Sequence, residues 1–70
     1  MYSYLRGQMI KAGISIVQLS RDIGVSEKTL RNKLNGETEF TWMEVQAIHR
    51  IVNPSLSIDE LFIKDEEVPA

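Results

Sequence analysis

The residue types between positions 27 and 35 are suited to hydrogen bonding with nucleobases. Lysine and arginine donate to guanine O6 and N7, asparagine pairs with adenine through two bonds, and glutamate accepts from cytosine N4. A helical wheel places such residues on the side of this segment that lies opposite Leu30 and Leu34. Lys28, Asn32 and Asn35 lie on this far side, Arg31 flanks them, and Glu27 lies in the exposed first turn. Many solvated helix faces have the same composition and bind nothing. Whether these residues contact DNA therefore has to be judged from the helices that carry them.

Two predicted helices joined by a tight turn carry this segment. Ser15 begins a helix over residues 16–23 and Ser26 begins one over 27–35, because each hydroxyl can accept a backbone N–H of the first turn. Gly24 can take the left-handed conformation that ends the first helix. This register is the helix-turn-helix spacing, in which the second helix fits the major groove of DNA. The helix starts after Ser15 and Ser26 can each receive a phosphate.

Three further helices are predicted around this motif, so the fold class is all-α with five helices. They cover residues 2–12, 42–52 and 58–62. Three pairs of residues have the spacing of a capping box, namely Ser15 with Gln18, Thr41 with Glu44 and Ser57 with Glu60. We expect one domain over residues 1–62, followed by an acidic, frayed tail over residues 63–70.

The composition excludes several classes of protein. Seventy residues leave room for one small domain, and the absence of cysteine excludes disulfides and cysteine-ligated zinc. No apolar run reaches the roughly 20 residues of a membrane span, and no signal sequence begins the chain, so we expect a soluble, cytoplasmic protein. The sequence has no nucleophile–base pair, phosphate-binding glycine loop or metal cluster, which predicts no enzyme, cofactor or metal site.

Charge is divided unevenly along the chain. Residues 1–36 carry a net charge of +4 and residues 37–70 one of −6, within an overall charge of −2. A basic front half favours a polyanionic partner such as double-stranded DNA. The acidic half, with its run Asp65-Glu66-Glu67, can be interpreted as a solvated surface, as a face that stays away from DNA, or as a surface for a protein partner.

With these motifs in register, the sequence resembles the phage repressor and Cro group of helix-turn-helix regulators, which have the lambda-repressor-like, XRE-type fold. The resemblance runs from about Leu5 to Phe62, and its carriers are the segments 12–15, 19–26, 29–36 and 56–62. The ending Lys33-Leu34-Asn35-Gly36 and the linker Phe40-Thr41-Trp42 look like those of small Cro-like proteins from phages and integrated elements. The resemblance implies a compact five-helix domain that binds DNA and regulates transcription.

The resemblance also implies roles for individual residues. The first turn of the third helix would read base pairs through Glu27, Lys28 and Asn32. The residues near DNA phosphates would be Ser15, Gln18, Ser26, Arg31, Asn35 and Gly36.

Three features depart from the family pattern. Ile16 stands where a phosphate-contacting glutamine is common, and it cannot make that hydrogen bond. Met9 and Leu34 replace a common buried arginine–glutamate pair, which predicts a direct apolar contact that desolvates no charge. Lys33 stands at a commonly apolar position, and we expect its stem to cover the core rim while its ammonium reaches solvent or a DNA phosphate.

The predicted fourth helix has one apolar stripe that faces the core. Val45, Ile48 and Val52 form this stripe. Beside it, Trp42 is predicted to be a core anchor. His49 is predicted to be a partly buried structural residue, since the partners for a metal or catalytic role are missing.

A second stripe of the fourth helix, Met43, Ala47 and Ile51, points away from the first. It predicts either the seam of a homodimer, which regulators of palindromic sites need, or a face covered by the fifth helix or the Leu56 loop.

Two functions stay open at this point. The first is a sequence-specific transcriptional regulator of phage Cro/repressor type that binds double-stranded DNA. The second is a small protein-interaction module on the same scaffold, such as an antitoxin or anti-repressor, which meets a protein through its acidic half or the Met43 stripe. Binding of heterologous DNA at low salt separates them, because nonspecific affinity arises from phosphate neutralisation.

Overall fold

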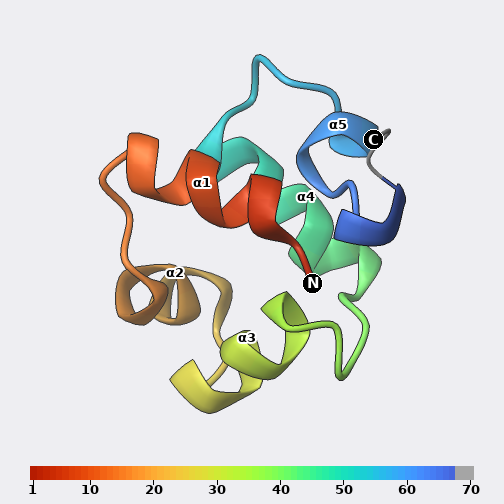
Figure 1. Cartoon of the computed structure of the whole chain (residues 1–70). Helices are drawn as coiled ribbons and strands as arrows, with labels where there is room; N and C mark the ends of the chain where they lie inside the picture. The colour runs from red at the N-terminus through yellow and green to blue at the C-terminus, as the bar shows by residue number, and fades with distance from the viewer. Residues whose placement is uncertain (68–70) are drawn as a thin grey trace.

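Five α-helices and a short 3-10 turn make up the computed structural model, which describes residues 1–67 (Figure 1). The elements are α1 (Ser3–Lys11), α2 (Ile16–Ile23), α3 (Glu27–Leu34), α4 (Trp42–Val52), α5 (Ile58–Leu61) and η1 (Asp65–Glu67). Within the described residues there is no strand, so the all-α prediction with five helices is confirmed. No helix in this part of the chain has the length and apolar character to cross a membrane.

The hydroxyl caps form at the helix starts where the sequence predicts them. Ser15, Ser26, Thr41 and Ser57 each accept the backbone N–H of the residue three positions on, at 3.0 to 3.2 Å. Only the capping box of Thr41 and Glu44 is complete, with the Glu44 carboxylate accepting the Thr41 N–H at 2.8 Å. In α5 the Glu60 carboxylate accepts the Ser57 hydroxyl at 3.2 Å, and only the hydroxyl half of that box forms.

The turn between α2 and α3 is closed by backbone hydrogen bonds. Gly24 has a φ of +78°, and its N–H donates to the Arg21 carbonyl at 3.3 Å. The next N–H, that of Val25, donates to the Ser20 carbonyl at 2.9 Å. These two bonds are those of a Schellman ending, which uses carbonyls that the helix cannot satisfy itself. The angle between the two helices is thereby held by the main chain.

Each helix contributes at least one fully buried aliphatic side chain to a single core. These side chains are Leu5, Leu19, Leu30, Leu34, Ile48 and Leu61. Met9 is also buried in this cluster, together with Leu34. Both residues therefore lie in the core, where no charge has to be desolvated, and the direct contact between them stays a prediction.

An aromatic cluster joins segments that are far apart in the sequence. The rings of Tyr2, Phe40 and Phe62 meet edge to face, with centroids 5.3 to 6.2 Å apart. The Tyr2 N–H also donates to the Leu34 carbonyl at 3.0 Å, so the N-terminus is fastened to the end of α3. Edge-to-face pairs of this kind stabilise a fold by about 0.5–1.5 kcal/mol beyond the area that they bury.

Trp42 does not anchor the core, and that prediction was wrong. Its side chain is 63% exposed at the first position of α4. Phe40, two residues earlier, packs with Tyr2 and Phe62 instead. The aromatic side chain that packs into the protein near the start of α4 is therefore that of Phe40, which belongs to the preceding loop.

The acidic segment after α5 is tied to the start of α1. The Asp65 carboxylate accepts the Ser3 N–H at 3.1 Å and the Ser3 hydroxyl at 2.9 Å, and the Asp65 N–H donates to the Met1 carbonyl at 3.0 Å. Tyr2, which precedes α1, has no capping side chain, so Asp65 supplies the cap from 62 residues away. The expected tail is thus held at Asp65, and its last residues, 68–70, lie outside the described part of the chain.

Candidate nucleic-acid interface

The outer face of α3 is polar and largely exposed. Lys28 is exposed and Asn32 is half-buried, while Leu30 and Leu34 point into the core with no exposed area. Glu27, Arg31 and Asn35 are also exposed. The division of this helix into a core face and a polar face therefore agrees with the helical wheel.

Both ends of α3 are held by hydrogen bonds. At the start, the Ser26 hydroxyl oxygen accepts the Thr29 N–H at 3.1 Å and its proton goes to the Thr29 hydroxyl at 2.8 Å. At the end, the N–H of Gly36 donates to the Lys33 carbonyl at 3.1 Å, and that of Glu37 to the Asn32 carbonyl at 2.9 Å. The polar face is therefore presented on a helix of defined length.

Glu27 and Arg31 form an ion pair along the exposed side of α3. The Arg31 Nη2 lies 2.9 Å from the Glu27 Oε1, at the spacing of four residues that brings side chains together on a helix. Both side chains keep about half of their exposure, so the pair contributes only about 0.3–0.5 kcal/mol to stability. It links a residue predicted to read bases with one predicted to contact phosphate.

Lys33 is not available to DNA, which corrects the prediction that it reaches solvent or a phosphate. The residue is buried, with its Nζ 2.7 Å from the Glu44 Oε1 and 3.1 Å from the Glu39 carbonyl oxygen. The lysine stem alone would leave the ammonium at the rim, but Glu44 of α4 and the loop carbonyl supply acceptors inside the protein. The ion pair connects the last turn of α3 to the first turn of α4.

Glu44 is the centre of this connection, in addition to the capping role that its spacing from Thr41 predicts. Burial raises the pKa of its carboxyl, but the hydrogen bond and charge of Lys33 and the bonds with Thr41 outweigh burial and hold the pKa below its ordinary value. The carboxylate therefore stays ionised at neutral pH. Glu44 lies eleven residues after Lys33 and on another helix, so no local sequence pattern predicts the ion pair.

The start of α2 lies beside α1 and α3. Ser15 and Gln18 are exposed, and the Ser15 hydroxyl accepts the Gln18 N–H. Ile16 is half-buried against the core cluster. Its apolar side chain is used for packing, which agrees with the departure noted at this position.

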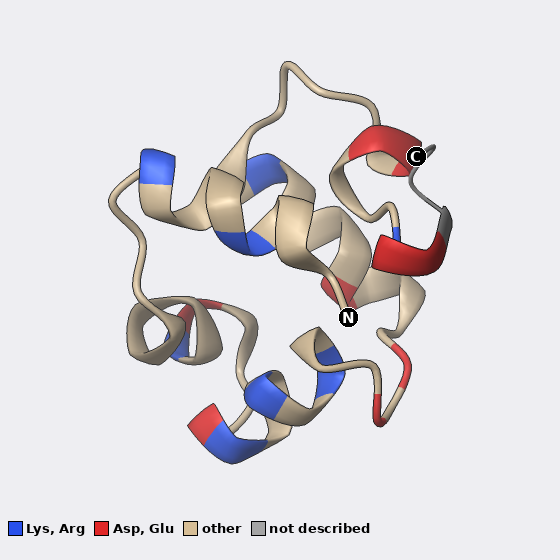
Figure 2. Ribbon diagram, viewed as in Figure 1, with Lys and Arg blue, Asp and Glu red and all other residues tan. Residues whose placement is uncertain are grey.

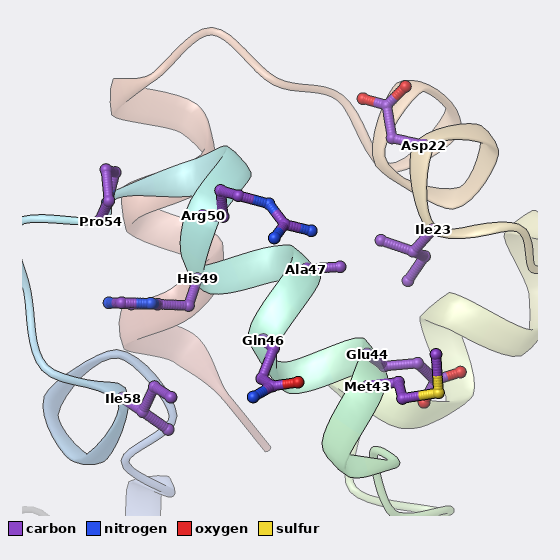
Figure 3. A pocket seen from close by; sticks show the side chains of 10 residues that line it. All are labelled: Asp22, Ile23, Met43, Glu44, Gln46, Ala47, His49, Arg50, Pro54 and Ile58. Carbon is purple, nitrogen blue, oxygen red and sulfur yellow. The ribbon is translucent and has the colours of Figure 1, made fainter.

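An open groove of about 670 Å³ runs between α2, α4 and the start of α5 (Figure 3). Met43, which is 79% exposed, and the half-buried Ala47 line it, whereas Ile51 packs against the core. The stripe predicted as a single face is thus divided between the groove and the core. Figure 3 shows the Arg50 guanidinium reaching over this groove toward Ala47 and Ile23.

His49 has the structural role predicted for it. Its Nε2 lies 2.5 Å from the Leu56 carbonyl oxygen, and the ring is half-buried. Because a carbonyl oxygen only accepts, Nε2 must carry the proton. Within the described residues, no group of histidine and carboxylate side chains could hold a metal ion.

Charge is segregated in space as well as along the sequence. Figure 2 shows most lysine and arginine on α1, α2 and α3, and most acidic residues on the loop before α4 and on α5 and η1, although α2 and α3 each also carry one acidic residue and α4 carries both signs. The polar face of α3 therefore lies in the basic part of the molecule.

Two capped helices joined through Gly24, with the second one turning a polar face outward, define a helix-turn-helix protein. The chain belongs to the family of Cro/C1-type HTH DNA-binding domains, which it matches over residues 4–63. The resemblance inferred from the sequence motifs is thus confirmed, and the protein is a DNA-binding regulator in the general sense of that family. No curated protein and no solved structure matches the chain significantly.

Proposed function

We propose that this protein is a sequence-specific transcriptional regulator of phage Cro/repressor type, which acts on double-stranded DNA in the cytoplasm with α3 in the major groove. The observation that carries the proposal is the face of α3, where Lys28 and Asn32 project on the side opposite the buried Leu30 and Leu34. A helix held at both ends and polar only on its outer side can enter a groove without exposing apolar surface.

In this proposal the side chains divide into two sets. Glu27, Lys28 and Asn32 contact base edges, because their donors and acceptors match cytosine, guanine and adenine. A second set contacts phosphates and sets the register on DNA without reading the sequence. This set consists of Ser15, Gln18, Ser26, Arg31, Asn35 and Gly36. Lys33 is left out because its ammonium is bound to Glu44.

The experiment that tests the proposal is selection of binding sites from a random double-stranded library with the purified protein. We expect enrichment of one sequence motif. Heterologous competitor DNA is added so that only specifically bound sequences are retained. A library that stays unenriched at about 50 mM salt even with this competitor present would overturn the proposal, because the competitor removes the nonspecific phosphate attraction that is strongest at low salt.

The same selection tests the proposed homodimer. The exposed Met43 and the groove beside Ala47 are the apolar surface on which a second copy could pack. A dimer predicts a palindrome with half-sites about 34 Å apart. A single enriched half-site would contradict this geometry and support a monomer.

The alternative is a protein-interaction module, an antitoxin or anti-repressor, which would use the acidic half or the Met43–Ala47 groove. The observation that favours it is the exposure of two large apolar side chains, Met43, which lines this groove, and Trp42, which precedes it in the sequence. A titration with heterologous duplex at about 50 mM salt discriminates between the two functions, since an interaction module is expected not to bind.

A further inference from the structure

A small polar hollow lies where α1, α2 and the end of α3 meet. Its space of about 60 Å³ is lined by Arg6, Ile16, Arg31, Leu34 and Asn35. The aliphatic side chains come from the packed interior, and the two arginines and the asparagine supply the polar groups. Arg6 also lines a second hollow with Ser15 and Ile16, so its side chain lies between the start of α2 and the end of α3.

Two arginines line this hollow, and the Glu27 carboxylate is paired with one of them, so a net positive charge remains beside it. Arg6 makes no salt bridge within residues 1–67, and Arg31 uses only its Nη2 for Glu27. A guanidinium has five N–H donors in a planar fork, so most of the donors of both side chains stay free. Two cations beside one small space repel each other unless an anion lies between them. The planar forks of arginine match the oxygens of a phosphate in particular.

The hollow also lies directly beside the base-reading face of α3. Glu27, Arg31 and Asn35 follow one another at intervals of four residues and form one row along the helix. Lys28 and Asn32 form the adjacent row. A group bound at Arg31 therefore lies next to the row proposed to face base edges, which is where the DNA backbone borders the groove.

We propose that Arg6 and Arg31, assisted by the Asn35 amide, clamp one backbone phosphate of the bound DNA. Arg6 is the new member of the interface, since it lies on α1, outside the helix-turn-helix. This inference rests on the proposed function, because the ligand is a phosphate of the same DNA. Glu27 positions Arg31 for this role through the bond to Nη2, which leaves the other donors of the Arg31 guanidinium for the phosphate.

The test is the salt dependence of binding to a heterologous duplex, followed by fluorescence anisotropy between about 50 and 200 mM salt. Arg6→Ala is expected to lower affinity roughly tenfold at low salt for every sequence alike. It should also reduce the log–log slope against salt, and loss of both arginines should reduce the slope by about 0.9, the contribution of one neutralised phosphate. Lys11→Ala is the matched control, because it removes a charge from the same helix at a residue that lines neither hollow.

Arg31→Ala and the double variant complete the design. Two arginines on one phosphate predict that the double variant loses less affinity than the sum of the two single losses in log units. Thermal unfolding confirms that each variant is folded, and exposed Arg6 on a helix surface tolerates alanine.

The outcomes separate the two levels of inference. If the wild-type protein binds DNA and Arg6→Ala behaves like Lys11→Ala, the clamp is overturned and the proposed function survives. If the wild-type protein binds no duplex at 50 mM salt, both fall. Replacing the phosphates of a selected site one at a time by neutral methylphosphonate gives a second readout. At one position we expect the neutral group to weaken the wild type more than Arg6→Ala, and to weaken the double variant least. If no position behaves in this way, the clamp is contradicted.

Discussion

Lys28 and Asn32 are the side chains on which the specificity of the proposed interface depends most directly. They lie on the outer face of α3, and neither side chain has a hydrogen bond within residues 1–67 that would have to break on binding. We expect Lys28→Ala and Asn32→Ala each to cost roughly 1–3 kcal/mol of binding free energy and to relax the preference at one base pair. Competition with sites altered at single base pairs measures both effects. Intact affinity and site preference in the double variant would show that α3 does not read the groove.

Lys33 and Glu44 illustrate how a charged residue can serve the fold instead of the ligand. Their ion pair is about nine-tenths shielded from solvent, and Glu44 also caps α4. Removing one partner of a fully buried pair costs about 3–5 kcal/mol, and a pair at the core rim costs less, so we expect about 1–3 kcal/mol for Lys33→Met. Urea unfolding of Lys33→Met, Glu44→Gln and the double variant isolates the coupling. Additive losses would mean that the two side chains do not stabilise each other.

The lowered pKa of Glu44 predicts a pH dependence of stability. The unfolded chain binds a proton at Glu44 at higher pH than the folded protein does, so the contribution of Glu44 is fully present above its ordinary pKa. It is lost as the pH falls through the lowered pKa of the folded state. Unfolding measured between about pH 3 and 6 should therefore show a shallower loss on acidification in Glu44→Gln than in the wild type. Equal pH profiles would contradict the role given to the carboxylate.

At the scale of the element, the turn between α2 and α3 depends on a glycine at position 24. Its φ of +78° lies in the left-handed region, and a Cβ built there meets no atom within 4 Å. Gly24→Ala is therefore expected to cost about 1–2 kcal/mol purely through the backbone conformation. Gly24→Asn should cost less, because asparagine tolerates this region. Thermal unfolding tests the order of the three proteins, and an alanine variant as stable as the wild type would contradict it.

Helix starts were predictable from the sequence because their determinants are local. Ser15, Ser26, Thr41 and Ser57 each bond to a backbone N–H three residues away, a distance that the chain spans without any tertiary contact. The same reasoning predicted a complete capping box three times, whereas only Thr41 and Glu44 form one. The side chains of Gln18 and Glu60 have other acceptors, donors or solvent available, and a local rule does not choose among them.

At the scale of the whole molecule, size bears on the form of the DNA site. The longest dimension of the protein is 33 Å, and two half-sites lie about 34 Å apart on the same face of DNA. One copy presents a single α3, so a palindromic site requires two copies. The acidic groups of α5 and η1 lie away from α2 and α3 (Figure 2), which gives the molecule a polarity that orients it toward a polyanion.

The hydrogen bonds between Asp65 and Ser3 predict that the segment after α5 contributes to the free energy of unfolding of the whole domain. Asp65→Ala removes the cap of α1 and should cost about 1 kcal/mol of unfolding free energy, as other N-cap losses do. DNA affinity should be unchanged, since Asp65 lies outside the proposed interface. Glu66→Ala, which has no such bond among the described residues, is the control in thermal unfolding. Equal stabilities would mean that the segment after residue 62 contributes nothing, as the predicted domain boundary implies.

The candidate interface was predictable where residue type and helical spacing suffice. Lys28 and Asn32 follow from a wheel on a helix that contains two leucines, and Ile16 was recognised as unable to bind phosphate. Lys33 was misjudged because its acceptor, Glu44, lies on another helix. The role proposed for Arg6 was not predictable, because only the packing of α1 against the helix-turn-helix brings this residue and Arg31 to the same hollow.

The sequence by itself determined the elements, the family and the face of α3, because caps, glycine turns and apolar periodicity act over a few neighbouring residues. Only the tertiary structure decided which loop residue fills the aromatic cluster with Tyr2, where the Lys33 ammonium goes, and which residue caps α1. Each of these contacts joins segments that are separated along the chain. Their partners are selected by the packing of the whole domain, where the available volume and the nearest acceptor outweigh the local preference of a side chain.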